Sequence, residues 1–312
     1  MAKQKQKPII PPRLSPGDTV GIVAPASPFE RKTFNRGIAA LHTLGYRTLV
    51  THDLFLKNGY LAGSDLQRAG LINRFFADGT VKAILCAKGG FGSLRVLPLL
   101  DYTLIRQNPK IFVGFSDITA LLAALYRKCN LVTFHGPVVT TLGESDKKTK
   151  DAMLVALSSN ERLEIKPQKG ITVQSGSASG PVLAGNLTTL CHLLGTPYAP
   201  PFTGHILLIE DRGETLYRLD RMLTQMKLAG CFKGLAGLAL GSFEGCGSEE
   251  EFHEVVRNIF REYAIPILAG LDMGHSPSNI TIPIGLEATL DAAQQWLGFH
   301  KPATWSNGVS PE

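Results

Sequence analysis

The chain has 312 residues, 44% of them hydrophobic, and its 32 Lys and Arg against 26 Asp and Glu give a formal net charge of +6. A chain of this length and composition can bury a large core, and it is long enough for two domains. The cations are scattered rather than gathered among aromatics, so we expect no nucleic-acid binding. One short cluster, at residues 147, 148 and 150, is expected to be a solvated lysine-bearing loop.

Neither a membrane span nor an export signal is expected. No uninterrupted apolar run approaches the ~18 residues that cross a bilayer, and residues 1–13 lack an apolar stretch of signal-peptide length. The five cysteines are odd in number and widely spaced, without a CxxC pair, which argues against a disulfide framework and against a zinc site. These features favour a soluble protein of the reducing cytoplasm.

The first half of the chain alternates short β-rich runs with longer helical runs. Such alternation predicts a parallel sheet covered by helices on both faces, with ligands bound beyond the carboxyl ends of the strands. The expected elements, strand and helix in turn, are 19–24, 31–44, 47–50, 64–77, 83–86, 94–100, 111–115 and 117–128.

A polar stretch containing Gly and Ser separates this half from the rest. We therefore expect an N-terminal domain over 1–157, a linker over 158–179 and a C-terminal domain over 180–312. The pattern beyond the linker is less regular. Its last part, 279–285 and 287–291, is expected to form two strands joined by a turn.

Ser116 stands where a β-rich run meets a helical run. Residues 111–115 read as a buried strand, and apolar residues then recur at spacings of three and four. A hydroxyl at this junction lies near the free amides of a helix N-terminus, which stabilise negative charge. Serine is also a favoured N-cap, so position alone leaves both a cap and a nucleophile open.

A serine nucleophile needs a base and a group that orients the base. Of the eight histidines, His275 is favoured because it follows a glycine in a loop after a β-like run, and His135 is its competitor. Glu210 ends the apolar strand 206–209 and is the candidate acid. Glu214, four residues later, is a rival for that role.

The loop Lys88-Gly-Gly-Phe-Gly-Ser93 follows the third strand. It lacks the third glycine of GxGxxG and contains no GK[ST], so both common phosphate fingerprints fail. Its glycines can instead bring amides near Ser116, and the amides of Gly90 and Asp117 would then form an oxyanion hole. The serine motif lacks the second glycine of GxSxG, which disfavours a conventional α/β-hydrolase.

Taken in order, the motifs over about residues 14–291 resemble the LD-carboxypeptidase family of serine peptidases. The resemblance is carried by Gly17-Asp-Thr-Val-Gly-Ile-Val-Ala-Pro-Ala-Ser27, Lys88-Gly-Gly-Phe-Gly92, Gly114-Phe-Ser-Asp-Ile-Thr119, Thr133-Phe-His-Gly-Pro137, Ala184-Gly-Asn-Leu187, Leu208-Ile-Glu-Asp211 with Tyr217 and Asp220-Arg221, and Gly274-His275.

The resemblance implies a flavodoxin-like N-terminal domain, a smaller β-rich α/β C-terminal domain and a triad of Ser116, Glu210 and His275 across the cleft between them. It further implies a homodimeric enzyme without metal or cofactor that releases terminal D-alanine at the L,D bond of murein tetrapeptides in peptidoglycan recycling. Lys88 and Gly89 are expected to bind substrate. Lys88 and Phe91 stand where many members carry Arg and Tyr.

Two alternatives remain open at this point. Microcin C immunity peptidases resemble the same family and cleave aminoacyl-nucleotide amides, for which an aromatic or extended loop would be needed to hold the base. A non-catalytic module that binds a nucleotide at the strand ends is the other.

Overall fold

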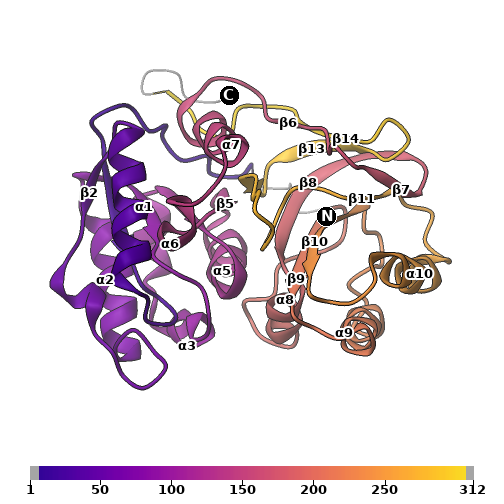
Figure 1. Ribbon diagram of the computed structural model, residues 1–312, viewed down its shortest axis with the longest axis horizontal. Coiled ribbons are helices and arrows are strands. Elements are labelled where there is room, and N and C mark those ends of the chain that lie inside the picture. Colours follow the sequence, from indigo (N-terminus) through magenta and orange to yellow (C-terminus); the bar gives the residue numbers. More distant parts are fainter. Residues whose placement is uncertain (1–6, 307–312) are drawn as a thin grey trace, which may run out of the picture.

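A computed structural model describes residues 7–306 of the chain. Residues 1–6 and 307–312 lie outside the described residues. They are the beginning of the stretch in which no export signal is expected and the end of the predicted C-terminal domain. Two halves lie side by side, each built on one sheet (Figure 1). Within the described part, no helix is long and apolar enough to cross a membrane.

The first sheet has six strands in the order β12-β5-β4-β3-β1-β2. Strands β1 to β5 run parallel, and their spatial order β2-β1-β3-β4-β5 is the flavodoxin-like order, which confirms the predicted fold class. The inner strands of this sheet are mostly apolar because helices cover both faces. The six strands are β1 (Thr19–Val23), β2 (Arg47–Leu49), β3 (Val81–Cys86), β4 (Ile111–Gly114), β5 (Thr133–His135) and, antiparallel to β5, β12 (Ile282–Ile284).

The four helical runs predicted in this half form to within a few residues, and the structure adds helices at 102–107, 139–142 and 147–158 that were not predicted. α2, for example, begins after Ser64, whose side chain accepts a hydrogen bond from the amide of Gln67 in a capping box. The α-helices are α1 (Arg31–Thr43), α2 (Asp65–Ala77), α3 (Ser93–Val96), α4 (Tyr102–Gln107), α5 (Thr119–Cys129), α6 (Val139–Leu142) and α7 (Lys147–Ser158), and the 3₁₀ turns are η1 (His52–Phe55), η2 (Leu97–Leu99) and η3 (Ser116–Ile118).

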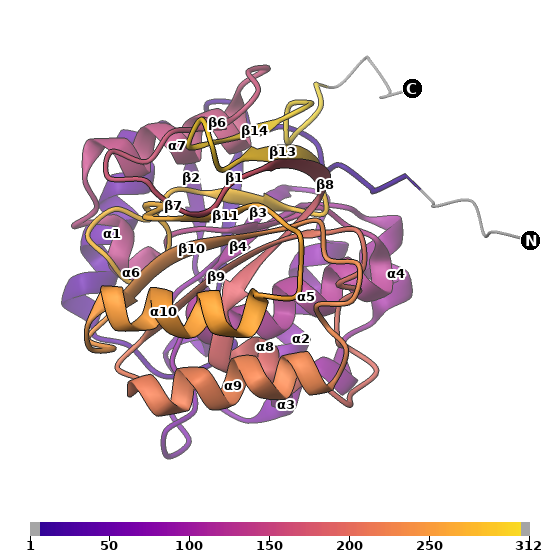
Figure 2. The same ribbon diagram turned by 90° about the vertical axis from the view of Figure 1, so that its right-hand side faces the viewer.

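The second sheet has eight strands in the order β6-β14-β13-β8-β9-β10-β11-β7. The four central strands β8 to β11 are parallel, and antiparallel strands flank them on both sides. Three helices lie together on one side of this sheet (Figure 2). The elements are β6 (Glu164–Ile165), β7 (Ile171–Gln174), β8 (Ser177–Asn186), α8 (Leu187–Leu193), β9 (Ile206–Arg212), α9 (Leu216–Leu228), β10 (Gly237–Glu244), α10 (Glu249–Phe260), β11 (Ile267–Ala269), β13 (Glu287–Asp291) and β14 (Trp296–Phe299).

The segment expected as a linker, 158–179, contains β6, β7 and the start of β8. β6 and β7 are the two edge strands of the second sheet, and an edge strand tolerates the polar composition that suggested a linker. The two expected strands near the end of the chain do form, but they belong to different sheets, because the chain crosses from β12 to β13 at Gly285, whose amide donates to the carbonyl of Val182. We keep 1–157 and 180–312 as the proposed domains.

The lysine cluster expected in a solvated loop lies instead at the start of α7, which Asp146 caps through the amide of Thr149. Lys148 contributes a 2.5 Å ion pair with Asp272, which precedes the loop of His275. The expectation of a solvated loop was wrong because an N-cap residue followed directly by a polar first helical turn has the same composition as a loop.

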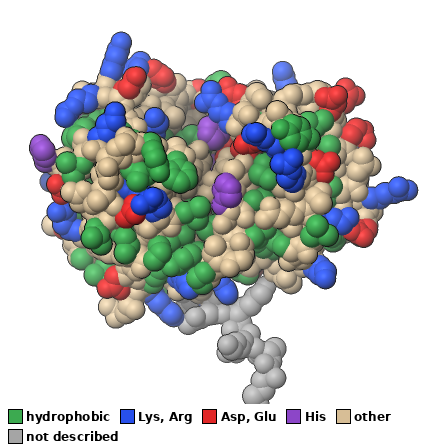
Figure 3. Space-filling view, turned by 90° about the horizontal axis from the view of Figure 1, so that it is seen from below, with side chains coloured by type: hydrophobic (Ala, Val, Ile, Leu, Met, Phe, Trp, Pro, Cys, Tyr) green, Lys and Arg blue, Asp and Glu red, His purple; other side chains and the backbone are tan. Residues whose placement is uncertain are grey.

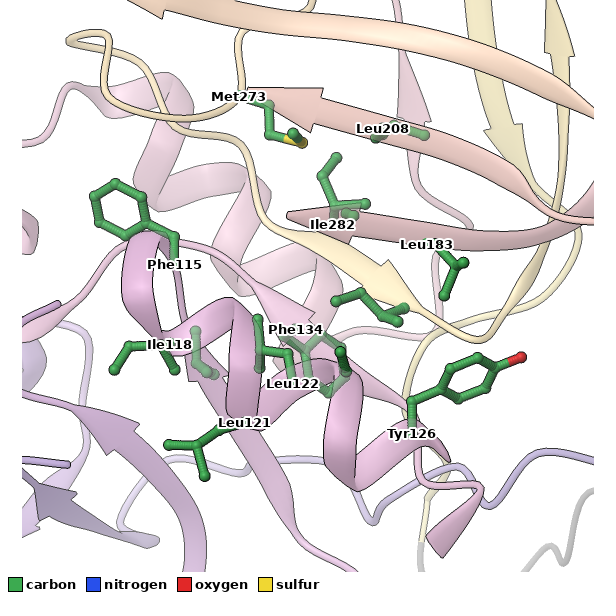
Figure 4. Packing of buried hydrophobic residues seen from close by; sticks show 14 of the residues in the cluster. Phe115, Ile118, Leu121, Leu122, Tyr126, Phe134, Leu183, Leu208, Met273 and Ile282 are labelled. Carbon is green, nitrogen blue, oxygen red and sulfur yellow. The ribbon is translucent and has the colours of Figure 1, made fainter. Parts of the chain in front are cut away.

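Apolar side chains fill the space between the two halves (Figure 4). Leu122 of α5 and Phe134 of β5 are fully buried and lie beside Ile282 of β12, while Leu183 and Leu208 approach from the second sheet. Burying such side chains contributes roughly 1.5–3 kcal/mol each. The groups that project into the crevice from both halves are therefore held on one packed core.

Candidate active site

Ser116 sits on a strained turn between β4 and α5. Its φ of 63° lies in the left-handed region that non-glycine residues seldom adopt. The turn is tight: a Cβ at Gly114 would lie 2.6 Å from the Ile118 side chain. Phe115, not Ser116, occupies the N-cap position of the 3₁₀ turn η3, and the Ser116 hydroxyl contacts His275 instead, so the cap interpretation does not describe it. A strained strand-to-helix turn that exposes the serine oxygen is the arrangement seen in nucleophile elbows.

His275 and Glu210 reach Ser116 from the second half of the molecule. The Ser116 Oγ lies 3.2 Å from His275 Nε2, and Glu210 Oε2 lies 2.6 Å from His275 Nδ1. A carboxylate at Nδ1 accepts the Nδ1–H, which leaves Nε2 free to accept the hydroxyl proton. The structure thus brings together the three residues selected from the sequence. Figure 3 shows histidine side chains near the middle of the face where the halves meet.

The loop that carries His275 is fastened to both halves. The Asn279 side chain accepts a 2.9 Å hydrogen bond from the amide of Gly274, and the Asn279 amide donates to Thr149 Oγ1 of α7 at 2.9 Å. The His275 ring packs on Phe115, with centroids 4.9 Å apart. These contacts cross from the second half to the first, so the imidazole is positioned relative to the serine and not only to the glutamate.

Glu210 is fully buried at the end of β9. Burial raises its pKa, and the hydrogen bond with His275 opposes that shift. The close approach depends on Gly274, because a Cβ there would lie 2.6 Å from Glu210 Oε2. The rival Glu214 instead faces Arg218, at 3.4 Å. The geometry therefore selects Glu210 over Glu214 as the partner of the histidine.

The competing histidine, His135, is fully buried in β5, and among the described residues neither of its ring nitrogens has a hydrogen-bond partner. Burial lowers its pKa to about 3, helped by the nearby His275. Its ring meets Phe115 edge-on, with centroids 6.0 Å apart. His135 does not bond Ser116 and is a neutral core residue near physiological pH.

The glycine loop after β3 lies against the serine. A Cβ at Gly89 would be 3.0 Å from the Ser116 Cβ, and a Cβ at Gly90, which has a φ of 108°, would collide with the Ser27 side chain. Ser27 Oγ in turn accepts a 3.1 Å hydrogen bond from the amide of Phe91. The loop thus needs glycine to place its backbone beside Ser116, as expected for a source of oxyanion-hole amides.

A cleft of about 280 Å³ opens beside the three residues. It is lined by Gly90, Phe91, Leu94, Ser116, Asp117, Asn186, Thr188, Thr189, His192, Asp211, Arg212, Glu214 and His275. Gly89 and Lys88, the expected substrate-binding residues, do not line it. Lys88 is exposed, and its ammonium lies 3.4 Å from the carbonyl oxygen of Pro28. The structure does not bring Lys88 to the cleft.

The Asp117 side chain is buried next to the serine. Its Oδ2 accepts a 2.8 Å hydrogen bond from the amide of Ser93 at the start of α3. Burial raises the pKa of Asp117, and this hydrogen bond opposes the shift. The carboxylate therefore ties the glycine loop to the nucleophile turn. The backbone amide of Asp117 remains the candidate oxyanion donor.

Sequence reasoning missed two buried residues of the site. Arg68 of α2 is 3% exposed, donates to the carbonyl oxygens of Pro25 and Gly92 and pairs with Asp65, so one guanidinium holds two of the loops at the strand ends. Asn186 caps α8 and lines the cleft. The helical periodicity does not predict that the Arg68 side chain is buried. An Asn directly before a helical run, in contrast, does predict a helix N-cap at Asn186.

Family models match both halves of the chain. The LD-carboxypeptidase N-terminal domain matches residues 20–136, and the LD-carboxypeptidase C-terminal domain matches residues 179–290. A Bacillus subtilis protein named probable murein peptide carboxypeptidase is 37% identical over 294 residues, covering 91% of this chain and 92% of that protein. The Escherichia coli microcin C7 self-immunity protein MccF is 30% identical, covering 91% of this chain and 93% of that protein.

A solved structure gives the same result for the fold. The MccF-like protein from Bacillus anthracis superposes with a TM-score of 0.90 at 28% sequence identity, covering 94% of this chain and 99% of that one. Similarity thus extends over nearly the whole chain, and it includes one protein named for murein peptides and another named for self-immunity to microcin C7.

Proposed function

This chain belongs to the LD-carboxypeptidase family, and from that premise we propose that it is a serine-type carboxypeptidase that releases terminal D-alanine from murein tetrapeptides. The single observation that supports the mechanism most strongly is the continuous contact from Ser116 through His275 to Glu210, made by residues from two different sheets. The relative named for murein peptides supports the substrate.

In the proposed mechanism, the Ser116 oxygen attacks the carbonyl carbon of the last peptide bond while His275 Nε2 takes the hydroxyl proton. The resulting imidazolium donates this proton to the nitrogen of the departing D-alanine, which leaves an acyl-enzyme. A water molecule then attacks the ester with His275 again as the base. Glu210 fixes the tautomer and stabilises the imidazolium through the 2.6 Å contact at Nδ1.

The amides of Gly90 and Asp117 are the proposed oxyanion donors. A Cβ at Gly89 would lie 3.0 Å from the Ser116 Cβ, so the backbone of this loop runs close to the serine, and the amide after the nucleophile is the customary second donor. Loss of one such donor commonly costs ~10²-fold or more in rate. No cofactor is needed by this mechanism, because the serine supplies the nucleophile.

The proposed setting is cytoplasmic recycling of cell-wall peptides by a homodimer, as the family resemblance implies. All five cysteines are free and buried, in keeping with a reducing compartment. The cleft has a volume of only about 280 Å³, which suits a peptide end rather than a polymer.

Mass analysis of products after incubation with a panel of muropeptides tests the proposal. We expect loss of one alanine from the tetrapeptide and no cleavage of the tripeptide or pentapeptide. An intact tetrapeptide after prolonged incubation with enzyme that reacts with a fluorophosphonate would refute the substrate while retaining the nucleophile.

The second candidate is cleavage of aminoacyl-nucleotide amides, favoured by the 30% identity to the microcin immunity protein. Phe91 is the only Phe, Tyr or Trp side chain among the described residues that line the cleft, so the aromatic support for a nucleotide base is sparse. An aminoacyl sulfamoyl adenosine assayed beside the tetrapeptide separates the two, since the higher kcat/KM identifies the substrate class.

A further inference from the structure

The glycine loop after β3 is held by side chains that take no part in the proposed chemistry. Gly90, the proposed oxyanion donor of this loop, lines the cleft. The two amides that follow it at positions 91 and 93 are both hydrogen-bonded: the amide of Phe91 donates to Ser27 Oγ at 3.1 Å, and the amide of Ser93 donates to Asp117 Oδ2 at 2.8 Å. The direction of the Gly90 amide therefore depends on contacts made by the residues after it.

Arg68 of α2 makes a further contact with this loop, at the carbonyl oxygen of Gly92. Its Nη1 donates to this oxygen at 2.9 Å and also donates to the carbonyl oxygen of Pro25 in the loop after β1. The peptide unit that joins Gly92 to Ser93 is thus held on both sides, by Arg68 at the carbonyl oxygen and by Asp117 at the N–H. Because a peptide unit is planar, these two hydrogen bonds leave the end of the loop little freedom.

The guanidinium of Arg68 is built into the protein interior. The residue is 3% exposed, and its Nη2 pairs with Asp65 in the first turn of the same helix. A Cβ at Gly92, which has a φ of 127°, would lie 2.8 Å from Arg68 Nη1, so the cation packs directly on the loop backbone. A buried cation requires partners, and this one finds two of them on loops at the carboxyl ends of the strands.

The same cation acts on the nucleophile turn through Asp117. Burial raises the pKa of Asp117, while hydrogen bonding by Ser93 and the positive charge of Arg68 oppose that shift. An ionised carboxylate is the stronger acceptor for the Ser93 amide, and the backbone amide of Asp117 is the second proposed oxyanion donor. Arg68 therefore supports the backbone on both sides of the proposed hole.

We propose that Arg68 is a positioning residue for the oxyanion hole. Its hydrogen bonds to loop carbonyl oxygens keep the Gly90 amide directed at the oxygen that becomes negative when Ser116 attacks. Arg68 is not among the described residues that line the cleft, so it acts through the loop and not on the substrate. This inference rests on the proposed function, because it concerns how the proposed oxyanion hole is held. The charge on that oxygen develops only on the way to the transition state, so the effect belongs in kcat and not in KM.

The test removes the guanidinium and measures turnover per competent active site. Arg68→Ala is labelled to completion with a fluorophosphonate, and the final amount of label counts the sites that are folded and reactive. The kcat for D-alanine release from the tetrapeptide is then divided by that count. We expect kcat per site to fall ~10²-fold, as for the loss of an oxyanion donor, with KM within about 3-fold of the wild type. The rate of labelling should fall by a similar factor, because the phosphonyl oxygen occupies the same hole.

Ethylguanidinium supplies the atoms that this substitution deletes. Added at millimolar concentration, it should raise kcat per site of Arg68→Ala by about 10-fold, the range of a charge-assisted hydrogen bond. Tetramethylammonium carries the same charge without an N–H donor and should give no gain. Arg68→Lys serves the same comparison if the alanine variant does not fold, and its shorter, unforked ammonium should still lower kcat per site by about 10-fold.

Arg95 offers a matched control at the same carboxylate. Its Nε and Nη2 donate to Asp65 Oδ2 at 3.0 and 2.8 Å, and its side chain is 49% exposed. Arg95→Ala therefore removes a cation from Asp65 while the hydrogen bonds from Arg68 to Pro25 and Gly92 remain. We expect its kcat per site to stay within about 2-fold of the wild type.

The outcomes are distinct. A wild-type kcat per labelled site in the Arg68 variants, with only the number of sites reduced, overturns the inference and makes Arg68 structural. A loss in KM alone, equal effects of the two added cations, or an equal loss in Arg95→Ala overturns it as well. A wild-type enzyme that is labelled but releases no D-alanine refutes the proposed substrate, and the rates of labelling then decide the role of Arg68 by themselves.

Discussion

Gly274→Ala should disable the enzyme although the new methyl group never touches a substrate. The Ala Cβ would lie 2.6 Å from Glu210 Oε2 and 2.7 Å from the Glu210 Cβ, whereas ordinary contact begins near 3.4 Å. The carboxylate or the histidine loop must therefore move by roughly 0.8 Å, and misplacement of about 1 Å at a catalytic constellation costs ~10²-fold in rate. We expect kcat/KM to fall by at least that factor.

Backbone strain accompanies the same substitution and needs a matched control. Gly274 has a φ of 112°, where an L-residue costs about 1–3 kcal/mol. Gly247, in the exposed loop after β10, has a φ of 96°, and a Cβ there meets nothing within 4 Å. Gly247→Ala should therefore lose the unfolding free energy that corresponds to the backbone strain alone, measured by denaturant titration, while keeping wild-type kcat/KM.

The assay is D-alanine release from the tetrapeptide, supported by the rate of labelling with a fluorophosphonate, which needs no knowledge of the substrate. If Gly274→Ala and Gly247→Ala lose the same activity, or if Gly274→Ala labels at the wild-type rate, then the close packing of Gly274 on Glu210 does not position the histidine, and the reasoning fails.

Three further substitutions probe the site and its support. Glu210→Gln should lower kcat/KM by about 10³- to 10⁴-fold without loss of thermal stability, because burial already disfavours its charge; retained activity would reassign the acid. The pKa of His135 is lowered to about 3, so between pH 6.5 and 3 the unfolded chain binds a proton that the folded chain does not. The free energy of unfolding should therefore fall on acidification by up to about 1.4 kcal/mol per pH unit. His135→Phe should flatten this pH dependence in urea titrations, and an unchanged slope would contradict the assignment of His135 as a buried neutral residue. Thr149→Val leaves the buried amide of Asn279 without an acceptor, so the free energy of unfolding should fall by about 1–3 kcal/mol, and kcat/KM should fall with it. The control Thr33→Val, at an exposed hydroxyl, should change the free energy of unfolding by no more than about 0.5 kcal/mol.

The sequence predicted well those features that depend on local pattern. The strands and helices around Ser116 follow from hydrophobic periods that differ between strand and helix, and the serine falls at the change of period. The triad was identified by the order of several motifs along the chain, and the distances now join its members across 159 and 65 residues.

Features that depend on long-range packing could not be predicted in the same way. β12 and β13 are adjacent in sequence, yet β12 completes the first sheet, because the choice of pairing partner depends on which edge is free. The direction of the Lys88 side chain depends on a loop in which Gly90 and Gly92 adopt positive φ. Periodicity can assign the helix position of Arg68 to the core or to the surface. It cannot predict which carbonyl oxygens accept hydrogen bonds from the Arg68 side chain.

The most direct measurement of the central proposal compares Ser116→Ala, His275→Ala and the double variant in one assay of D-alanine release. Residues that act as a unit are non-additive, so each single variant should lose ~10⁴-fold or more in kcat, and the double variant should be no worse than either. Independent, multiplying losses, or a Ser116→Ala enzyme within 10-fold of the wild type, would contradict a catalytic unit assembled between the two halves.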